Sequence, residues 1–313
     1  MTNIQWEKEV DVIVLGSGGA ALSAAVSAAD NGASVLILEK THQIGGTTAY
    51  SGGIPWVPLN HYMKEAGYED NREAAINFIK RLALGRAEDY MIERFVDKGH
   101  EVFQALHDKT PLRFATPEGY PEYYKNLPEA LQNGTRSLDP KPFNLNEIGE
   151  WGQHLRQNPI FPPLTLAEGG AVGGIDFQMI AERMQNNIVT MGRSLIASLF
   201  KGCLDRGVET LLNTAGRELV LGDNQEIIGV IAETSEGEKK YFKANKGVIL
   251  ASGGFEWNKQ LTKAFLKMDI THPVSPPGNE GDALMMAMKA GAALDNMSEA
   301  WWYPAMIDPT FEY

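Results

Sequence analysis

The chain has 313 residues, of which 43% are hydrophobic and 22% charged, a composition typical of a globular protein. Its formal net charge of −12 argues against a nucleic-acid-binding role, which needs cations clustered on one face. Cys203 is the only cysteine, so no internal disulfide or cysteine-based metal cluster can form, as fits a reducing compartment. We expect its thiol to be buried and inert.

The start of the chain has no apolar core of signal-peptide length, and no apolar run approaches the roughly 20 residues of a membrane span. We therefore expect a cytoplasmic protein without a membrane span. We predict no metal site. His100 and His107 share a helix face, but two histidines alone make a poor metal site.

Residues 10–40 have the order strand, glycine turn, helix, strand and acid. A β-branched run from Val10 to Leu15 leads into a glycine turn, and an alanine-rich helical stretch extends to about Asp30. A second apolar run, residues 34–38, ends on Glu39. This order is that of a dinucleotide-binding βαβ unit.

Each part of this unit has a physical reason. Gly16 permits a tight exit from the strand, and Gly18 lets backbone amides at a helix N-terminus approach a diphosphate. Glu39 lies near the expected spacing of about 20 residues for an acid that binds a ribose diol, and an acid there repels the 2′-phosphate of NADP. The predicted cofactor-binding residues of the unit are Gly16, Ser17, Gly18, Gly19, Ala20 and Glu39.

Residues 45–53 combine glycine pairs with hydroxyl side chains, which excludes a regular helix or strand interior. Such a stretch suits a loop that wraps a polar ligand with amide and hydroxyl donors. Taken alone it fits a plain surface loop equally well, but its position after a dinucleotide unit favours the ligand loop.

Glu39-Lys40, Gly45-Gly46-Thr47 and Ser51-Gly52-Gly53 together resemble the FAD-binding flavoproteins of the fumarate reductase/succinate dehydrogenase superfamily. The resemblance implies an α/β, Rossmann-like FAD-binding domain with a parallel sheet, helices and a small β-meander. It implies FAD as the cofactor, bound non-covalently, because His42 is not placed like a flavin-linking histidine. It adds further residues beside the cofactor: Lys40, Gly45, Gly46, Thr47, Thr48, Ser51, Gly52 and Gly53.

Apolar spacing predicts helices over residues 71–84 and 90–106. A loop follows in which Tyr120, Tyr123 and Tyr124 crowd together. Such a loop can pack on a rigid apolar ligand and offer phenol hydroxyls to a carbonyl, although residue chemistry alone favours a surface loop held by aromatic anchors. Pro121-Glu122-Tyr123-Tyr124, followed by Gly134-Thr135-Arg136-Ser137, resembles the 3-ketosteroid dehydrogenase branch of the superfamily. The resemblance implies that Tyr123 is catalytic.

Residues 176–206 read as two helices broken near Gly192, and four short strands are expected at residues 208–212, 218–221, 227–232 and 241–243. The resemblance places the backbone near Ala215 beside the adenine. A separate buried strand at residues 247–251 ends on a glycine pair, as the family's Ala-x-Gly-Gly-Phe segment does, which implies that Ala251, Ser252 and Gly253 approach the cofactor.

Residues 278–282, Gly-Asn-Glu-Gly-Asp, resemble another segment of the family near the flavin, which implies roles for Asn279 and Asp282. Helix capping is a sufficient structural explanation of Asp282, at or near the start of a helix over residues 283–290 that Gly291 ends. We expect Met285, Met286 and Met288 to be packing residues on that helix.

The resemblance covers about residues 8–305 and divides the chain into an FAD-binding domain, residues 1–275, and the start of a substrate (cap) domain, residues 276–313. Family chains continue through the cap and return to the FAD domain. We therefore expect this chain to lack the full cap domain, as the FAD domain of a longer protein or a truncated product.

The resemblance implies hydride transfer from a ketone-activated, 3-ketosteroid-like substrate to flavin N5, acting on a CH–CH bond and giving an enone. The expected partner is a small apolar ketone or enone, with an unknown electron acceptor. Three alternatives stay open: a fumarate-reductase-like reductase of C=C bonds, an FAD-binding fragment without turnover, and a plain NAD-binding protein. Tyr120, Tyr123 and Tyr124 argue against the first, because a dicarboxylate site needs cations.

Overall fold

The structure is a computed structural model and describes residues 4–117, 119–159, 161–170 and 174–302. These residues form two compact units. The sheet unit comprises residues 4–50, 154–156 and 203–302, and the helical unit comprises residues 51–153 and 157–202 where described. The boundary expected between residues 275 and 276 stays a prediction; residues 276–302 make their contacts within the sheet unit, and 303–313 lie outside the described residues.

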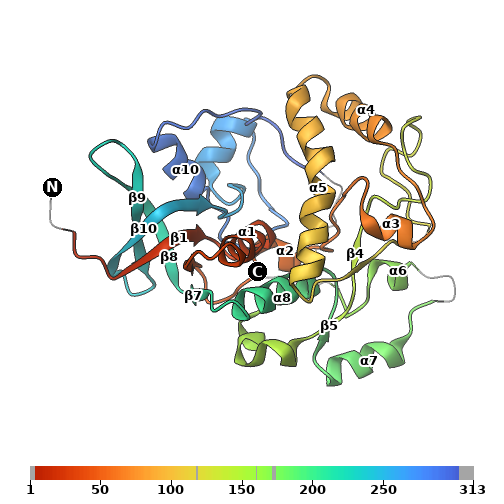
Figure 1. Cartoon of the computed structure of the whole chain (residues 1–313), viewed down its shortest axis with the longest axis horizontal. Coiled ribbons are helices and arrows are strands. Elements are labelled where there is room, and N and C mark those ends of the chain that lie inside the picture. The colour runs from red at the N-terminus through yellow and green to blue at the C-terminus, as the bar shows by residue number, and fades with distance from the viewer. Residues whose placement is uncertain (1–3, 118, 160, 171–173, 303–313) are drawn as a thin grey trace. The chain divides into compact units, whose positions relative to one another are not determined.

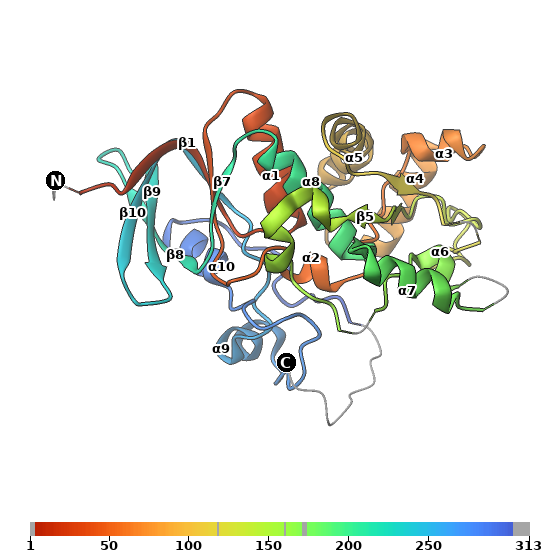
Figure 2. The ribbon, with the colours of Figure 1, turned by 90° about the horizontal axis from the view of Figure 1, so that it is seen from below.

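The sheet unit is built on a six-stranded sheet of order β7-β2-β1-β10-β9-β8 (Figure 1). Neighbouring strands among β7, β2, β1 and β10 are parallel, whereas β10, β9 and β8 form an antiparallel meander (Figure 2). The predicted α/β class with a parallel sheet and a small meander is confirmed. The strands are β1 (Lys8–Leu15), β2 (Val35–Leu38), β7 (Glu209–Leu211), β8 (Thr214–Leu221), β9 (Ile227–Thr234) and β10 (Lys239–Leu250).

The long strand β10 differs from the expectation of two separate strands. Asn245 and Lys246 interrupt the apolar pattern, yet the strand runs on because β9 pairs with its first half and β1 pairs with both halves. The register between β1 and β10 shifts between Val10 and Val12, which is where the two halves meet. Ladder hydrogen bonds therefore override the residue pattern here.

Helix α1 (Gly19–Asp30) connects β1 to β2 and buries Ala21, Leu22, Ala25 and Val26. These mostly small side chains let the helix approach the strands closely. Cys203, near the end of α8 (Met191–Leu204), is buried with its Sγ 3.7 Å from the Leu22 carbonyl oxygen. The expected burial of Cys203 is confirmed, and this burial raises the pKa of its thiol to about 12, which disfavours the reactive thiolate.

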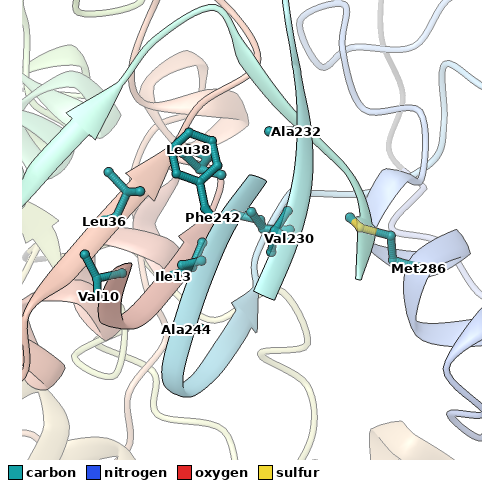
Figure 3. Close-up of a cluster of buried hydrophobic side chains, with 10 residues drawn as sticks. Val10, Ile13, Leu36, Leu38, Val230, Ala232, Phe242, Ala244 and Met286 are labelled. Atoms are coloured by element: carbon teal, nitrogen blue, oxygen red, sulfur yellow. The ribbon is translucent and has the colours of Figure 1, made fainter. Parts of the chain in front are cut away.

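A second buried cluster combines strands and one helix of the sheet unit (Figure 3). Phe242 of β10 and Val230 of β9 pack with residues of β1 and β2, and Met286 of α10 (Asp282–Lys289) points into the same cluster. The meander and the parallel strands therefore share one hydrophobic cluster. The cluster consists of Val10, Ile13, Leu15, Leu36, Leu38, Val230, Ala232, Phe242, Ala244 and Met286.

Asp282 lies near the N-cap of α10, as expected, but its capping role and the packing of two methionines are not borne out. Gly281, in the left-handed region, is the N-cap, and Asp282 is the first helical residue and makes no capping hydrogen bond. Of the three methionines only Met286 is buried, while Met285 and Met288 are 40% and 39% exposed. The α10 helix therefore buries a narrower face than its composition indicates.

The helical unit contains the two predicted amphipathic helices, α4 (Arg72–Ala83) and α5 (Asp89–Lys109), which bury Ala75, Ile76, Ile92 and Val96 between them. The break predicted near Gly192 lies earlier, because α7 (Phe177–Gln185) is followed by β6 (Ile188–Val189) before α8 begins. Within the described part of the chain, no helix is both long enough and apolar enough to cross a membrane.

Short elements complete both units. The sheet unit also contains α2 (Gly46–Tyr50), α9 (Lys259–Leu261) and the π-helix η2 (Thr262–Leu266). The helical unit contains α3 (His61–Glu65), β3 (Phe114–Ala115), β4 (Asp139–Pro140), β5 (Phe143–Asn144), α6 (Leu166–Gly169) and most of the 3-10 helix η1 (Leu145–His154).

Candidate functional site

A pocket lies in the sheet unit where β1, β2 and β10 end. The carboxyl ends of parallel strands share one edge of a sheet, and ligands of open α/β folds bind there. Fifteen of the predicted cofactor-binding residues line this pocket, namely Gly16, Ser17, Gly18, Gly19, Ala20, Glu39, Lys40, Gly46, Thr47, Thr48, Ala251, Ser252, Gly253, Asn279 and Asp282. It is also lined by Leu15, Leu38, Thr41, Arg156, Gly216, Pro276, Pro277, Gly278 and Met286.

The glycine turn at the pocket requires its glycines. Gly16 has a φ of 103°, and a Cβ there would lie 2.5 Å from the carbonyl oxygen of Ala251. Gly18 is the N-cap of α1 and provides no capping side chain, while the Gly19 amide donates to Thr48 Oγ1 at 3.1 Å. The start of α1 therefore presents backbone amides and a positive dipole end to the pocket.

Glu39 is only 7% exposed, and protein groups already hold its carboxylate. Ser17 Oγ donates to Oε2 at 2.6 Å, and the amide and hydroxyl of Thr41 each donate to Oε1 at 2.9 Å. A carboxylate can accept about four hydrogen bonds, so three donors fix its orientation and leave capacity for one more. This arrangement suits recognition of a hydroxyl group.

Lys40 links the pocket to the chain segment before α10. Its Nζ contacts Asp282 at 2.6 Å and Glu280 at 2.9 Å, and Asp282 also contacts Arg217 at 2.9 Å. The Asp282 carboxylate is thus held by two cations, and this pairing replaces the capping role expected for it. The ion pairs hold residues 280–282 against the end of β2.

Asn279 connects the glycine-rich segments of the sheet unit. Its Nδ2 donates to Thr47 Oγ1 at 2.8 Å and to Glu256 Oε1 at 2.7 Å. Gly253 has a φ of 84°, and a Cβ on it would lie 2.7 Å from Asn279 Oδ1. Three segments far apart in the sequence therefore meet at one wall of the pocket.

Five predicted cofactor-binding residues do not line the pocket. Gly45 is one step removed from the pocket, because its amide donates at 3.0 Å to Oγ of Ser17, which lines it. Ala215 is buried in β8, while its neighbour Gly216 lines the pocket. The remaining three, Ser51, Gly52 and Gly53, belong to the helical unit. There Gly53 has a φ of 67°, and a Cβ on it would lie 2.6 Å from Gly192.

Tyr123 lies in the helical unit and is 75% exposed, and Tyr124 is 57% exposed. Burial, followed by a hydrogen bond with Tyr123, raises the pKa of Tyr120. The two hydroxyls therefore form a pair whose outer member is open to solvent.

A buried ion cluster anchors the tyrosine loop, defined here as residues 119–137. Arg136 is fully buried and contacts Asp70 through Nη2 at 2.7 Å and Glu122 through Nη1 at 3.3 Å. Its guanidinium also lies over the ring of Trp56 at 5.5 Å, and Trp56 Nε1 donates to Glu122 at 3.2 Å. Glu122, the residue before Tyr123, is thus held by both Arg136 and Trp56, and burial raises its pKa.

His42 is exposed, and His107 Nδ1 lies 2.7 Å from Tyr62 Oη and 3.3 Å from His61 Nε2. No group of three or more His, Cys, Asp or Glu side chains that could hold a metal occurs among the residues that the structure describes.

The family model for an FAD binding domain matches residues 11–312. The chain belongs to this FAD-binding family. It is 33% identical over 306 residues to 4-oxocyclohexanecarboxylate 2-dehydrogenase of Sinomonas cyclohexanicum, covering 95% of this chain and 52% of that protein. It is 35% identical over 325 residues to 3-oxosteroid 1-dehydrogenase of Mycobacterium tuberculosis (strain ATCC 25618 / H37Rv), covering 96% of this chain and 57% of that protein.

Solved structures agree with this family membership. The 3-ketosteroid Δ1-dehydrogenase of Sterolibacterium denitrificans, in complex with 1,4-androstadiene-3,17-dione, superposes with a TM-score of 0.86 at 27% identity, covering 96% of this chain and 58% of that one. A flavocytochrome c3 fumarate reductase shares the fold, with a TM-score of 0.65 at 18% identity. The chain spans about half the length of the curated relatives it matches.

The pocket of this FAD-binding chain fits the adenosine diphosphate half of the cofactor. Amides at the start of α1 suit a diphosphate, and Glu39 retains an acceptor site for a ribose hydroxyl. The Nε of Arg156 is buried without a hydrogen-bond partner, which is the mark of a donor that a ligand completes.

Sequence reasoning missed Arg156, Thr41 and Gly216. Thr41 was open to prediction, since it follows Glu39-Lys40 directly and its hydroxyl donates to Glu39. Gly216 carries a weaker signal, a glycine inside a strand, and a Cβ on it would lie 2.9 Å from Leu15 Cδ1. Arg156 follows the 3-10 helix η1, and the sequence around it contains no binding motif. Its neighbours in the sequence therefore do not indicate that it lines the pocket.

Proposed function

We propose that this chain holds FAD non-covalently in the pocket of the sheet unit and forms part of an enzyme that dehydrogenates a ring bearing a ketone. The observation that carries this proposal is the similarity, over 95% and 96% of the chain, to two proteins whose names both describe dehydrogenation of an oxo-substituted ring. The substrate class is therefore a cyclic ketone, either an apolar steroid or a monocyclic oxo acid.

The cofactor contacts that we propose follow from the pocket. Gly18 and Ala20 offer amides to the diphosphate, with Gly19 beside it, and Glu39 accepts from the ribose. Ala251, Ser252 and Gly253 approach the cofactor from the end of β10, with Asn279 and Asp282 beside them. Non-covalent binding is supported by the exposure of His42.

Tyr123 is the proposed catalytic residue. Its side chain is exposed and its hydroxyl is hydrogen-bonded with that of Tyr120, so it can donate its proton to a substrate carbonyl. Glu122 and Arg136 hold the backbone beside it. Bound FAD supplies the oxidising power for removing two hydrogens from a C–C bond.

A ketone fits this loop better than a dicarboxylate does. The loop exposes the phenols of Tyr123 and Tyr124, which can bind a neutral carbonyl, and one cation, Lys125. Its arginine, Arg136, is fully buried and committed to Asp70 and Glu122. A dicarboxylate site requires cations that are free to form bidentate contacts. The likeness to a fumarate reductase is therefore one of fold.

The test is a visible spectrum of the purified chain, followed by anaerobic addition of a 3-ketosteroid or of 4-oxocyclohexanecarboxylate. We expect the flavin absorption bands to be present and to bleach with one of the two ketones. Tyr123→Phe should slow bleaching by about 100-fold or more, the usual contribution of a positioned acid or base. Tyr124→Phe, the adjacent exposed phenol, is the matched control and should retain the rate.

Other outcomes separate the parts of the proposal. A chain that binds FAD but is bleached by neither ketone contradicts the substrate class and supports a flavin-binding unit without turnover. A folded chain that retains no flavin after it is incubated with FAD and separated from the free cofactor contradicts the cofactor site itself. Equal losses in Tyr123→Phe and Tyr124→Phe would remove Tyr123 from the mechanism.

A further inference from the structure

Three residues of the sheet unit come from a part of the chain that otherwise builds the helical unit. His154–Arg156 pair with the loop after β2 through a parallel bridge between Ile44 and Leu155. The Ile44 amide donates to the His154 carbonyl at 2.8 Å, and the Arg156 amide donates to the Ile44 carbonyl at 3.0 Å. Leu155 is fully buried, so the segment is firmly anchored. The anchoring places Arg156 in the wall of the pocket.

The guanidinium of Arg156 is poorly satisfied by the protein. It has five N–H donors, and the structure gives it one hydrogen bond, from Nη2 to Thr41 Oγ1 at 3.2 Å. Its Nε is buried and has no partner. Burial lowers the pKa of the guanidinium, and the charge of Glu39 opposes that effect. A buried donor without an acceptor destabilises the protein, so a bound acceptor would recover free energy here.

The other cation of the pocket differs in this respect. Lys40 is neutralised by two carboxylates, at 2.6 and 2.9 Å. Arg156 makes no ion pair with any residue that the structure describes, although Glu39 is near enough to influence its charge. The positive charge of Arg156 is thus the one that an anionic ligand can use without breaking an existing ion pair.

We propose that Arg156 binds the adenosine diphosphate half of FAD, donating from its guanidinium to phosphate or ribose oxygen. Its neighbours decide which half of the cofactor it meets. Arg156 is hydrogen-bonded to Thr41, and Thr41 is hydrogen-bonded to Glu39. Glu39 also accepts a hydrogen bond from Ser17, which belongs to the glycine turn before α1. These residues form the diphosphate and ribose end of the site. The inference rests on the FAD site proposed above.

ADP tests this inference without any need for turnover, because it lacks the flavin. We would measure the dissociation constants of ADP and FAD by calorimetry for the wild type, Arg156→Gln, Arg156→Lys and Arg206→Gln. Arg206 lies in the same unit, is paired with Asp30 at 3.1 Å and does not line the pocket, so its variant is the control for loss of charge. Circular dichroism of each variant reports folding.

We expect Arg156→Gln to weaken both ADP and FAD by about tenfold or more, the loss of a charged hydrogen bond. Arg156→Lys should recover part of this loss, and Arg206→Gln should bind both ligands as the wild type does. ADP affinity within twofold of wild type in Arg156→Gln overturns the inference, as does an equal loss in Arg206→Gln. If Arg156→Gln fails to fold, wild-type affinity in a folded Arg156→Lys overturns it. A wild type that binds neither ligand refutes the FAD site instead.

Discussion

Asp139, at the start of β4, carries a carboxylate that the helical unit buries without a cation. It is 3% exposed, and its Oδ2 accepts a hydrogen bond from the Ala167 amide at 3.1 Å, while Oδ1 has no partner. Burial raises the pKa of Asp139 above its usual value of 3.8, and the charge of Glu168 adds to the effect. The ionised form is therefore the costly one in the folded state.

The sign of the resulting pH dependence follows from proton binding. Because the folded state holds the Asp139 proton more tightly than the unfolded state, this group stabilises the fold at low pH. That stability is lost as the pH rises from about 3.8 through the folded pKa. Asp139→Asn keeps the acceptor for Ala167 and cannot ionise. We expect its free energy of unfolding, relative to wild type, to increase by about 1 kcal/mol between pH 4 and pH 7.

Urea unfolding at the two pH values measures this difference. Glu168→Gln is a useful control, because it removes the neighbouring charge while leaving the Asp139 carboxyl in place. A relative stability of Asp139→Asn that falls as the pH rises would contradict the assignment of Asp139 as a buried acid with a raised pKa.

Among larger elements, the tyrosine loop depends on one close backbone contact. Gly134 has a φ of 64°, and a Cβ on it would lie 1.3 Å from the Tyr120 carbonyl oxygen. Any side chain at this position must therefore displace the loop segment that contains Tyr120 and Tyr123. The ion cluster of Arg136 follows two residues later, so both anchors of the loop would be disturbed together.

Gly134→Ala should therefore loosen the tyrosine loop. Gly67→Ala is the matched control, since Gly67 has a φ of 79° in the same unit but nothing lies within 4 Å of its added Cβ. We expect the control to lose about 1 kcal/mol from backbone strain alone and Gly134→Ala to lose about 3 kcal/mol or more. Urea unfolding measures both losses, and limited proteolysis should cut within residues 119–137 in Gly134→Ala alone. Equal losses would show that the overlap is relieved without cost.

How far the sequence predicts each element depends on the range of the interactions that hold it. The βαβ unit was predictable because strand, turn and helix are each specified within a few residues of one another. The continuity of β10 was not predictable, because Asn245 and Lys246 look like a break in an apolar strand. The charge of Lys246 is met by Asp11 at 3.5 Å on β1, more than 200 positions earlier in the chain.

The same limit applies to the candidate site. The glycines that line the pocket were open to prediction because a glycine pair is itself a signal of close approach. Asp282 was identified, but with capping as its structural role, because its partner Lys40 is 242 residues away in the sequence. Arg156 was missed altogether, since only the pairing of residues 154–156 with Ile44 brings it to the pocket. Long-range pairing of this kind leaves no local pattern.

At the scale of the whole molecule, the two units share their chain in an unusual way. Residues 154–156 belong to the sheet unit but are flanked on both sides by chain of the helical unit. Helix α8 likewise begins in the helical unit and contributes its last residues, including the buried Cys203, to the sheet unit. Neither segment can hold its place in the sheet unit once the surrounding chain has unfolded.

We therefore expect both units to unfold in one cooperative transition, and FAD to stabilise both. A ligand that binds only the folded state adds about 2.7 kcal/mol at 100 times its dissociation constant. Hydrogen exchange at increasing urea concentration can locate that gain. Peptides from β1, at the pocket, and from α4, which contains none of the proposed cofactor contacts, should gain equal protection through global opening. Protection that rises in β1 while α4 exchanges as before would show that the units unfold separately, and that the segment carrying Arg156 can form its bridge to Ile44 without support from the helical unit.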